Sequence, residues 1–193
     1  MVGSEALLVE VDDPAMALSL ATWARSAAVE SGEIVPAART VLFDGVADPQ
    51  ALRDLLASWS PGRVHVDGPL VEIPTSYDGE DLAFVGEAWG TDRDGVVARH
   101  RSIEFVSSFC GFAPGFAYLA GLPDELAVPR LDSPRPRLAA GSVALGGPWC
   151  GIYPTSSPGG WRVIGHTDLV LWDATSARPA LLAPGTRVRF VPR

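Results

Sequence analysis

The sequence contains no lysine, so all 15 of its basic side chains are arginine. Without lysine the chain cannot form a Schiff base through a side-chain amine, carry biotin or supply the lysine of a P-loop. If a nucleotide takes part in the activity, its phosphates must be bound by arginine, by backbone N–H groups or by another subunit.

Cysteine is also scarce, since Cys110 and Cys150 are the only two, and their spacing does not match a metal-binding pair. Both lie in apolar, glycine-rich surroundings, which favours buried or half-buried thiols in a reducing compartment. The N-terminus lacks a basic segment followed by an apolar core, and no apolar run is long enough to span a membrane. We therefore expect a cytoplasmic protein with no membrane role.

The net charge of −8 argues against a nucleic-acid partner, because binding phosphates along a strand needs a basic surface. The charge is uneven. Residues 1–100 carry 17 acidic and 6 basic side chains, whereas residues 101–193 carry 6 acidic and 9 basic ones. The cationic second half suits a carboxylate or phosphate ligand, and a solvated acidic face in the first half explains the same asymmetry.

The order of elements predicts a small ferredoxin-like α/β domain in residues 1–68. Asp12-Asp13-Pro14 is typical of a helix start, and Gly32 is expected to end that helix. The expected elements are a strand at 6–11, a helix at 15–31, an extended pair at 34–43, a helix at 50–59 and a strand at 64–66. The turn cluster Asp67-Gly68-Pro69 marks the expected domain boundary.

Residues 69–193 are expected to form a second, mostly β domain. Residues 111–165 hold 10 glycines and 8 prolines, yet they are too apolar and aromatic to be disordered. The sequence therefore predicts an α+β protein whose second domain is rich in loops. The expected strands are at 70–73, 103–109, 142–145, 161–164, 169–172 and 186–191, with helices at 81–89 and 93–102.

The stretch from Gly141 to Thr167 is expected to be the functional surface. Its glycines allow close approach of backbone or ligand, and its tight loops are expected to bring Tyr153, Trp161 and His166 near one another. The local patterns Gly-Gly-Pro and Pro-Gly-Gly resemble an anion-binding nest of backbone N–H groups more than a metal site.

Histidine, tyrosine and arginine side chains in this half could carry chemistry. His166 lies in a tight Gly-His-Thr bend, and a functional and a structural role are equally compatible with it. His100, between two arginines on an expected helix, is more typical of a surface or interface. Tyr153 and Tyr118 follow glycine-containing turns and could donate to an anion or simply pack. Arg130 offers a planar fork for a carboxylate or phosphate, or an ordinary salt bridge.

Five motifs occur in a fixed order along the second half. They are GFAPGFAYL at 111–119, PR at 129–130, AGSVALGG at 140–147, GIYPTSSPGGWRVIGHT at 151–167 and LLAPGTRVRFVP at 181–192. Together they resemble the family of the B-type 5-oxoprolinase subunit, also described as allophanate hydrolase subunit 1 and as the sporulation histidine-kinase inhibitor KipI. The resemblance runs from about Val71 to the C-terminus, and over residues 1–66 only the order of elements agrees.

The resemblance implies a cyclophilin-like β-barrel after the small α/β domain. It implies that the chain is one subunit of an ATP-dependent amidohydrolase that opens 5-oxoproline to glutamate. The partners would be homologues of the C-type and A-type subunits of 5-oxoprolinase, one of which could bind the ATP. Two alternatives stay open: a KipI-like regulator that inhibits a histidine kinase, and a carboxyltransferase subunit of the allophanate hydrolase or urea carboxylase type.

On this basis we predict a small-molecule amide site without a metal. His166 is the first candidate for proton transfer, followed by His100 and Tyr153. The family usually has Gln-Thr where this chain has Trp149-Cys150, and proline where it has Ala139. The predicted substrate-binding residues are Arg130, Phe112, Pro114, Gly115, Tyr118, Ser142, Gly146, Gly147, Gly159, Gly160, Trp161 and Thr167.

Overall fold

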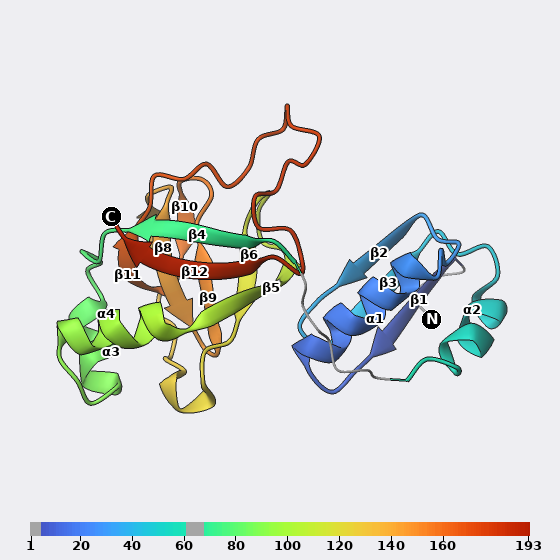
Figure 1. Cartoon of the computed structure of the whole chain (residues 1–193), viewed down its shortest axis with the longest axis horizontal. Helices are drawn as coiled ribbons and strands as arrows, with labels where there is room; N and C mark the ends of the chain where they lie inside the picture. The colour runs from blue at the N-terminus through green and yellow to red at the C-terminus, as the bar shows by residue number, and fades with distance from the viewer. Residues whose placement is uncertain (1–4, 61–67) are drawn as a thin grey trace. The chain divides into compact units, whose positions relative to one another are not determined.

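The computed structural model describes residues 5–60 and 68–193, which fall into two compact units on either side of Asp67 and Gly68 (Figure 1). The strand expected at residues 64–66 and the start of the expected boundary turn lie outside the described residues. Among the residues that are described, no helix is long and apolar enough to cross a membrane.

The N-terminal unit is a three-stranded antiparallel sheet with two helices. The strand order is β1-β3-β2, and the buried core includes Leu20, Val41 and Phe43. These are the first five elements of the expected ferredoxin-like order, and the ferredoxin-like assignment itself stays a prediction. The elements are β1 (Ala6–Glu10), α1 (Pro14–Ser26), β2 (Glu33–Pro36), β3 (Thr40–Asp44) and α2 (Pro49–Leu56).

Both helices begin as the sequence indicates, but α1 ends earlier. The Asp13 carboxylate accepts the backbone N–H of Met16 at 2.7 Å, and a proline follows it at the first helical position. The helix ends at Ser26 rather than near Gly32, because Ala28 takes a left-handed φ of 49°. The Ala28 N–H donates to the Arg25 carbonyl and the Val29 N–H to the Ala24 carbonyl, the pattern of a Schellman cap.

The C-terminal unit is built on a seven-stranded sheet in the order β11-β8-β9-β6-β5-β12-β4. Only β4 and β12 run parallel, and the other neighbours are antiparallel. Its strands are β4 (Leu70–Thr75), β5 (Glu104–Cys110), β6 (Ala117–Ala120), β8 (Ser142–Gly146), β9 (Trp149–Ile152), β11 (Arg162–His166) and β12 (Arg187–Pro192).

The two edges of this sheet meet, so the sheet is nearly closed into a barrel. Ser76, just after β4, exchanges backbone hydrogen bonds of 2.9 and 2.8 Å with His166 at the end of β11. The structure thus confirms a mixed α/β chain with a barrel-like sheet. The remaining elements are α3 (Leu82–Ala88), α4 (Arg93–Ser102), the 3-10 turn η1 (Asp124–Leu126) and a separate ribbon of β7 (Arg135–Leu138) and β10 (Ser157–Gly159).

The barrel interior is apolar, and both helices pack against it. Phe105, Leu145 and Phe190 are fully or almost fully buried there, and α3 and α4 add Val85 and Val96 to the same cluster. Burial of this kind is the main stabilising term for such a unit.

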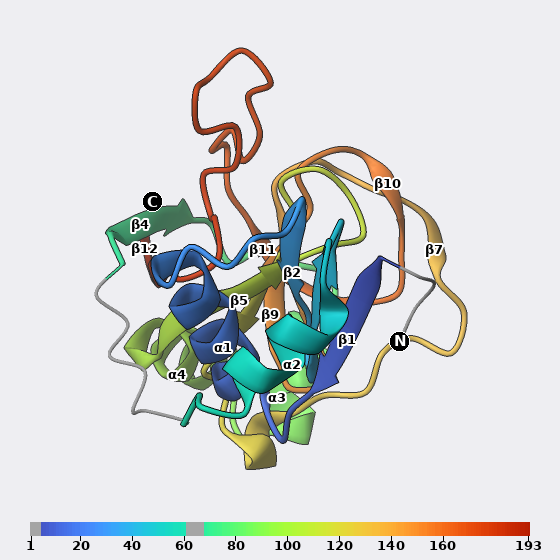
Figure 2. The same ribbon diagram turned by 90° about the vertical axis from the view of Figure 1, so that its right-hand side faces the viewer.

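The strand expected at residues 169–172 is wrong. Residues 167–186 form a long loop that projects from the barrel between β11 and β12 (Figures 1 and 2). Within it only Trp172 and Ala180 form an isolated bridge. The apolar residues of the expected strand therefore have no ladder in the described sheet, and Val170 and Trp172 stay exposed.

Candidate functional site

Seven aromatic rings form one connected cluster, which we call the aromatic cluster. Phe109 and Tyr118 stack with centroids 4.3 Å apart, and Phe116 makes edge contacts of 5.2 to 5.4 Å with Tyr118, Tyr153 and Trp161. The cluster comes from β5, β6, β9 and the segments beside them. Its members are Phe109, Phe112, Phe116, Tyr118, Trp149, Tyr153 and Trp161.

Strand alternation explains why β9 serves two cores. Trp149 packs with the aromatic cluster, whereas Cys150 and Ile152 point into the barrel interior. Gly151, on the same side as Trp149, leaves room for rings, since a Cβ there would lie 2.9 Å from Phe116.

Two of the glycines predicted to bind substrate make the same kind of room. A Cβ at Gly146 would lie 2.6 to 2.7 Å from three ring atoms of Trp161. A Cβ at Gly159 would lie 2.4 Å from the Tyr153 hydroxyl oxygen. The structure therefore gives these glycines a packing role against the aromatic cluster, whatever they do toward a ligand.

Tyr153 is buried, and its hydroxyl faces Gly159. Burial raises the pKa of Tyr153, and the opposing effects are a hydrogen bond from the backbone of Trp161 and the positive charge of Arg130. The hydroxyl therefore keeps its proton at neutral pH and is suited to donate a hydrogen bond rather than to remove a proton.

Arg130 is exposed and carries no ion pair or hydrogen bond to any of the described residues. One of its terminal nitrogens lies 3.9 Å from the position of a Cβ on Gly160, and its charge acts on Tyr153. The guanidinium is therefore free to bind an anion beside the aromatic cluster.

The neighbouring arginines are already engaged. Arg135 donates to both carboxylate oxygens of Asp81 at 2.9 and 3.0 Å and pairs with Glu80 at 2.9 Å. Arg162 lies 3.6 Å from Asp81 and 3.7 Å over the ring of Phe84. The contrast singles out Arg130. The sequence did not predict the pair of Arg135 and Asp81, because these partners are 54 residues apart.

Phe112 lies at the edge of the cluster. It is 62 % exposed, and its ring is 5.3 Å from Phe116 and 6.0 Å from Tyr153. Its φ of 69° is left-handed, which is uncommon for a bulky residue and often marks a functional position.

His166 lies at the seam of the barrel. Its Nε2 is 3.0 Å from Asp168 Oδ1, and Asp168 also pairs with Arg193. These two partners lower the pKa of Asp168, the hydrogen bond to His166 being the larger cause. Within residues 5–60 and 68–193, no hydrogen bond or ring contact joins His166 to Arg130 or to the aromatic cluster, so only Tyr153 and Trp161 of the expected trio share a cluster.

His100 is completely buried, so its expected place on a helix surface is wrong. Its Nδ1 is 2.8 Å from the Tyr77 hydroxyl and its Nε2 is 3.4 Å from Cys150 Sγ. Burial lowers the pKa of His100 to about 3, so the ring is neutral at physiological pH. The inner face of α4 carries it into the barrel interior, where Phe190 lies 4.4 Å away between ring centroids.

The other predicted residues are spread around these features. The Ser142 hydroxyl donates to the Ala139 carbonyl at 2.8 Å, and Thr167 is buried. Gly147 takes a left-handed φ of 59°, and Gly115, with φ of 84°, packs against Leu171 and Trp172. Pro114 is exposed.

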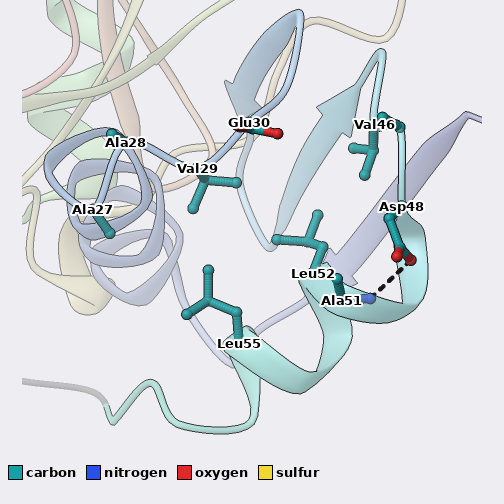
Figure 3. A pocket seen from close by; sticks show the side chains of 10 residues that line it. Ala27, Ala28, Val29, Glu30, Val46, Asp48, Ala51, Leu52 and Leu55 are labelled. Atoms are coloured by element: carbon teal, nitrogen blue, oxygen red, sulfur yellow. Dashed lines mark hydrogen bonds between the residues drawn. The ribbon is translucent and has the colours of Figure 1, made fainter.

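No group of three or more potential metal ligands occurs in the part of the chain that the structure describes. A shallow hollow of about 270 Å³ lies in the N-terminal unit between the end of α1 and α2 (Figure 3). Val29, Leu52 and Leu55 line it, with Glu30 and Asp48 as its only charged residues. Because it offers no cation, this hollow does not suit an anionic ligand.

Comparison with known proteins identifies relatives for most of the chain. The family described as carboxyltransferase domain, subdomains C and D, matches residues 1–182. The B-type 5-oxoprolinase subunit of Escherichia coli O157:H7 is 49% identical over 126 residues, 64% of this chain and 58% of that protein. Its counterpart in Haemophilus influenzae, which has the same name, is 42% identical over 157 residues, 79% of this chain and 74% of that protein. The chain thus spans little more than half of the E. coli relative.

Solved structures share the fold. The crystal structure of TTHA0988 matches with a TM-score of 0.78 at 32% identity, over 97% of this chain and 40% of that one. The urea amidolyase of Kluyveromyces lactis matches with a TM-score of 0.71 at 19% identity, over 98% of this chain and 14% of that one. In both proteins the shared fold is one part of a longer chain.

Proposed function

The chain belongs to the carboxyltransferase-domain family of subdomains C and D, and from this premise we propose that it is the B-type subunit of an ATP-dependent 5-oxoprolinase. The complex would open 5-oxoproline to glutamate together with A-type and C-type homologues. Identities of 42% and 49% to proteins named as B-type 5-oxoprolinase subunits support the reaction class. We also propose that the barrel is cyclophilin-like, that the N-terminal unit is ferredoxin-like, and that the complex acts in the cytoplasm, where the free thiols Cys110 and Cys150 would persist.

The observation that carries the proposal is the unpaired guanidinium of Arg130 beside the aromatic cluster, within the part of the chain that is described. The substrate 5-oxoproline has a carboxylate and a flat lactam ring. An arginine fork binds a carboxylate through two charge-assisted hydrogen bonds. Phe112 and Tyr153 present aromatic surface against which the lactam ring would pack.

The amide bond of the lactam is stable, so its oxygen must be activated before water attacks. ATP would supply a phosphoryl group for this activation. Because the chain has no lysine, we propose that ATP is bound by a partner protein of the complex. Tyr153, which keeps its proton, would donate a hydrogen bond to the lactam oxygen or the carboxylate.

His166 is our candidate for proton transfer, because its side chain is 37% exposed and Asp168 orients its ring. His100 has no solvent access, so we assign it to holding α4 against β9 rather than to the reaction. Replacing His166 with alanine while the complex still assembles should reduce turnover. Unchanged turnover would remove His166 from the mechanism.

The test of the function is reconstitution. The chain is mixed with its purified A-type and C-type partners, and ATP hydrolysis is measured with 5-oxoproline, allophanate or urea. We expect hydrolysis that depends on 5-oxoproline and on all three proteins. Hydrolysis only with allophanate or urea would overturn the assigned substrate. Tight one-to-one binding to a histidine-kinase dimerisation domain, with no substrate-dependent hydrolysis, would favour a regulator instead.

A further inference from the structure

Four exposed apolar side chains of the C-terminal unit come from two neighbouring loops. Phe112 is 62 % exposed, Val170 72 %, Trp172 39 % and Leu181 37 %. We call these four residues the Phe112–Trp172 surface. Grouped exposed side chains of this size are characteristic of interaction sites, whereas single exposed apolar residues are ordinary.

Contacts between the loops hold these residues together. A Cβ on Gly115, three residues after Phe112, would lie 2.8 Å from Trp172 Cβ and 3.1 Å from the Leu171 carbonyl oxygen. The Leu181 N–H donates to the Leu171 carbonyl at 3.0 Å, which ties the two sides of the projecting loop together. Trp172 and Ala180 form a bridge at the same place. The loop is therefore braced at its base, where it meets the Phe112 loop.

The backbone conformation of Phe112 also requires an explanation. A left-handed φ costs free energy for a bulky residue, and here it presents a phenylalanine to solvent, which costs more. Hydrogen bonds within the loop, from Ala113 N–H to the Gly111 carbonyl and from Phe116 N–H to the Ala113 carbonyl, fix this conformation. A side chain fixed outward in this way is already arranged for a partner.

We propose that the Phe112–Trp172 surface binds the C-type homologue of the complex. The inference rests on the proposed function in naming that partner. The surface is continuous with the candidate site, because Phe112 belongs to both and lies 6.0 Å from Tyr153 between ring centroids. A companion docked there covers the mouth of the Arg130 site and excludes water from it. In TTHA0988 the shared fold is only 40% of the chain, so this unit is joined to further protein there.

The test measures affinity directly. The full chain and the purified C-type homologue are titrated by calorimetry, using wild type, Trp172→Ser, Phe112→Ser and the control Leu70→Ser. Leu70 is 40 % exposed in the same unit but lies on β4. We expect both surface variants to weaken binding about 30-fold, as for central aromatic residues of an interface, and the control to match wild type. Thermal unfolding followed by circular dichroism checks that each variant is folded.

Several outcomes would overturn the inference. One is unchanged affinity in the folded surface variants, and another is absence of binding by wild type. A third is a stable dimer of the chain alone that Trp172→Ser dissociates, because a second copy would then occupy the surface. The function is tested separately by hydrolysis: activity with unchanged affinity in Trp172→Ser refutes only this inference, whereas weakened binding without 5-oxoproline-dependent hydrolysis refutes only the function.

Discussion

Acid should destabilise the C-terminal unit through His100. The ring is completely buried between Tyr77 and Cys150, and burial lowers its pKa to about 3. In the unfolded chain the same ring has a pKa near 6.5. The unfolded state therefore takes up the proton first as the pH falls.

The magnitude follows from these two values. The contribution of neutral His100 to stability is fully present above pH 6.5 and is lost progressively as the pH falls toward 3. Each pH unit within that range costs about 1.4 kcal/mol. Between pH 7 and pH 5 the loss is about 2 kcal/mol, a large share of the stability of a small unit.

Urea unfolding at pH 7, 6 and 5, followed by tryptophan fluorescence, measures this loss. His100→Asn should be less stable than wild type at pH 7, and the difference should shrink by about 2 kcal/mol at pH 5, because the variant has no buried imidazole to protonate. His166→Asn, which alters a partly exposed ring, is the control and should follow wild type. Equal losses in wild type and His100→Asn would refute the reasoning. If the variant does not fold, an imidazole NMR signal of His100 that titrates above pH 5 would refute it equally.

Two further predictions concern packing and buried charge. Gly146→Ala should destabilise the chain by roughly 1–3 kcal/mol in urea unfolding, because its Cβ would clash with Trp161, whereas Gly111→Ala, whose Cβ meets its nearest neighbour at 3.6 Å, should cost little; equal losses would contradict the packing role. Asp81→Asn should cost about 2–4 kcal/mol, since the buried carboxylate accepts from Arg135 and from the Val163 N–H, and Glu104→Gln at an exposed pair should cost far less; a small loss for Asp81→Asn would contradict the importance of this network.

Much of the fold could be predicted from the sequence because its signals are local. Asp13-Pro14 and Asp48-Pro49 mark helix starts, and the structure has α1 and α2 beginning there. The end of α1 was missed because Ala28, with no glycine or proline signal, takes the left-handed conformation that ends the helix. The strand expected at residues 169–172 failed for a non-local reason, since a strand needs a partner that no local pattern reveals.

The site was harder to predict because it depends on which way side chains face. Nothing in the sequence around Gly146 distinguishes a glycine that faces a ligand from one that faces Trp161. His100 lies between Arg99 and Arg101, which indicates a solvated helix face, yet the helix turns the histidine inward. The family resemblance carried the identification, and the match to residues 1–182 confirms it.

The central claim is that Arg130 binds the substrate carboxylate. Its most direct test is the KM for 5-oxoproline in the reconstituted complex, with Arg130→Gln compared to Arg137→Gln, whose side chain is exposed and donates to Ser156. Loss of charge-assisted hydrogen bonds should raise the KM about 10- to 100-fold in Arg130→Gln, and Arg137→Gln should match wild type. An unchanged KM in an assembled Arg130→Gln complex would contradict the account.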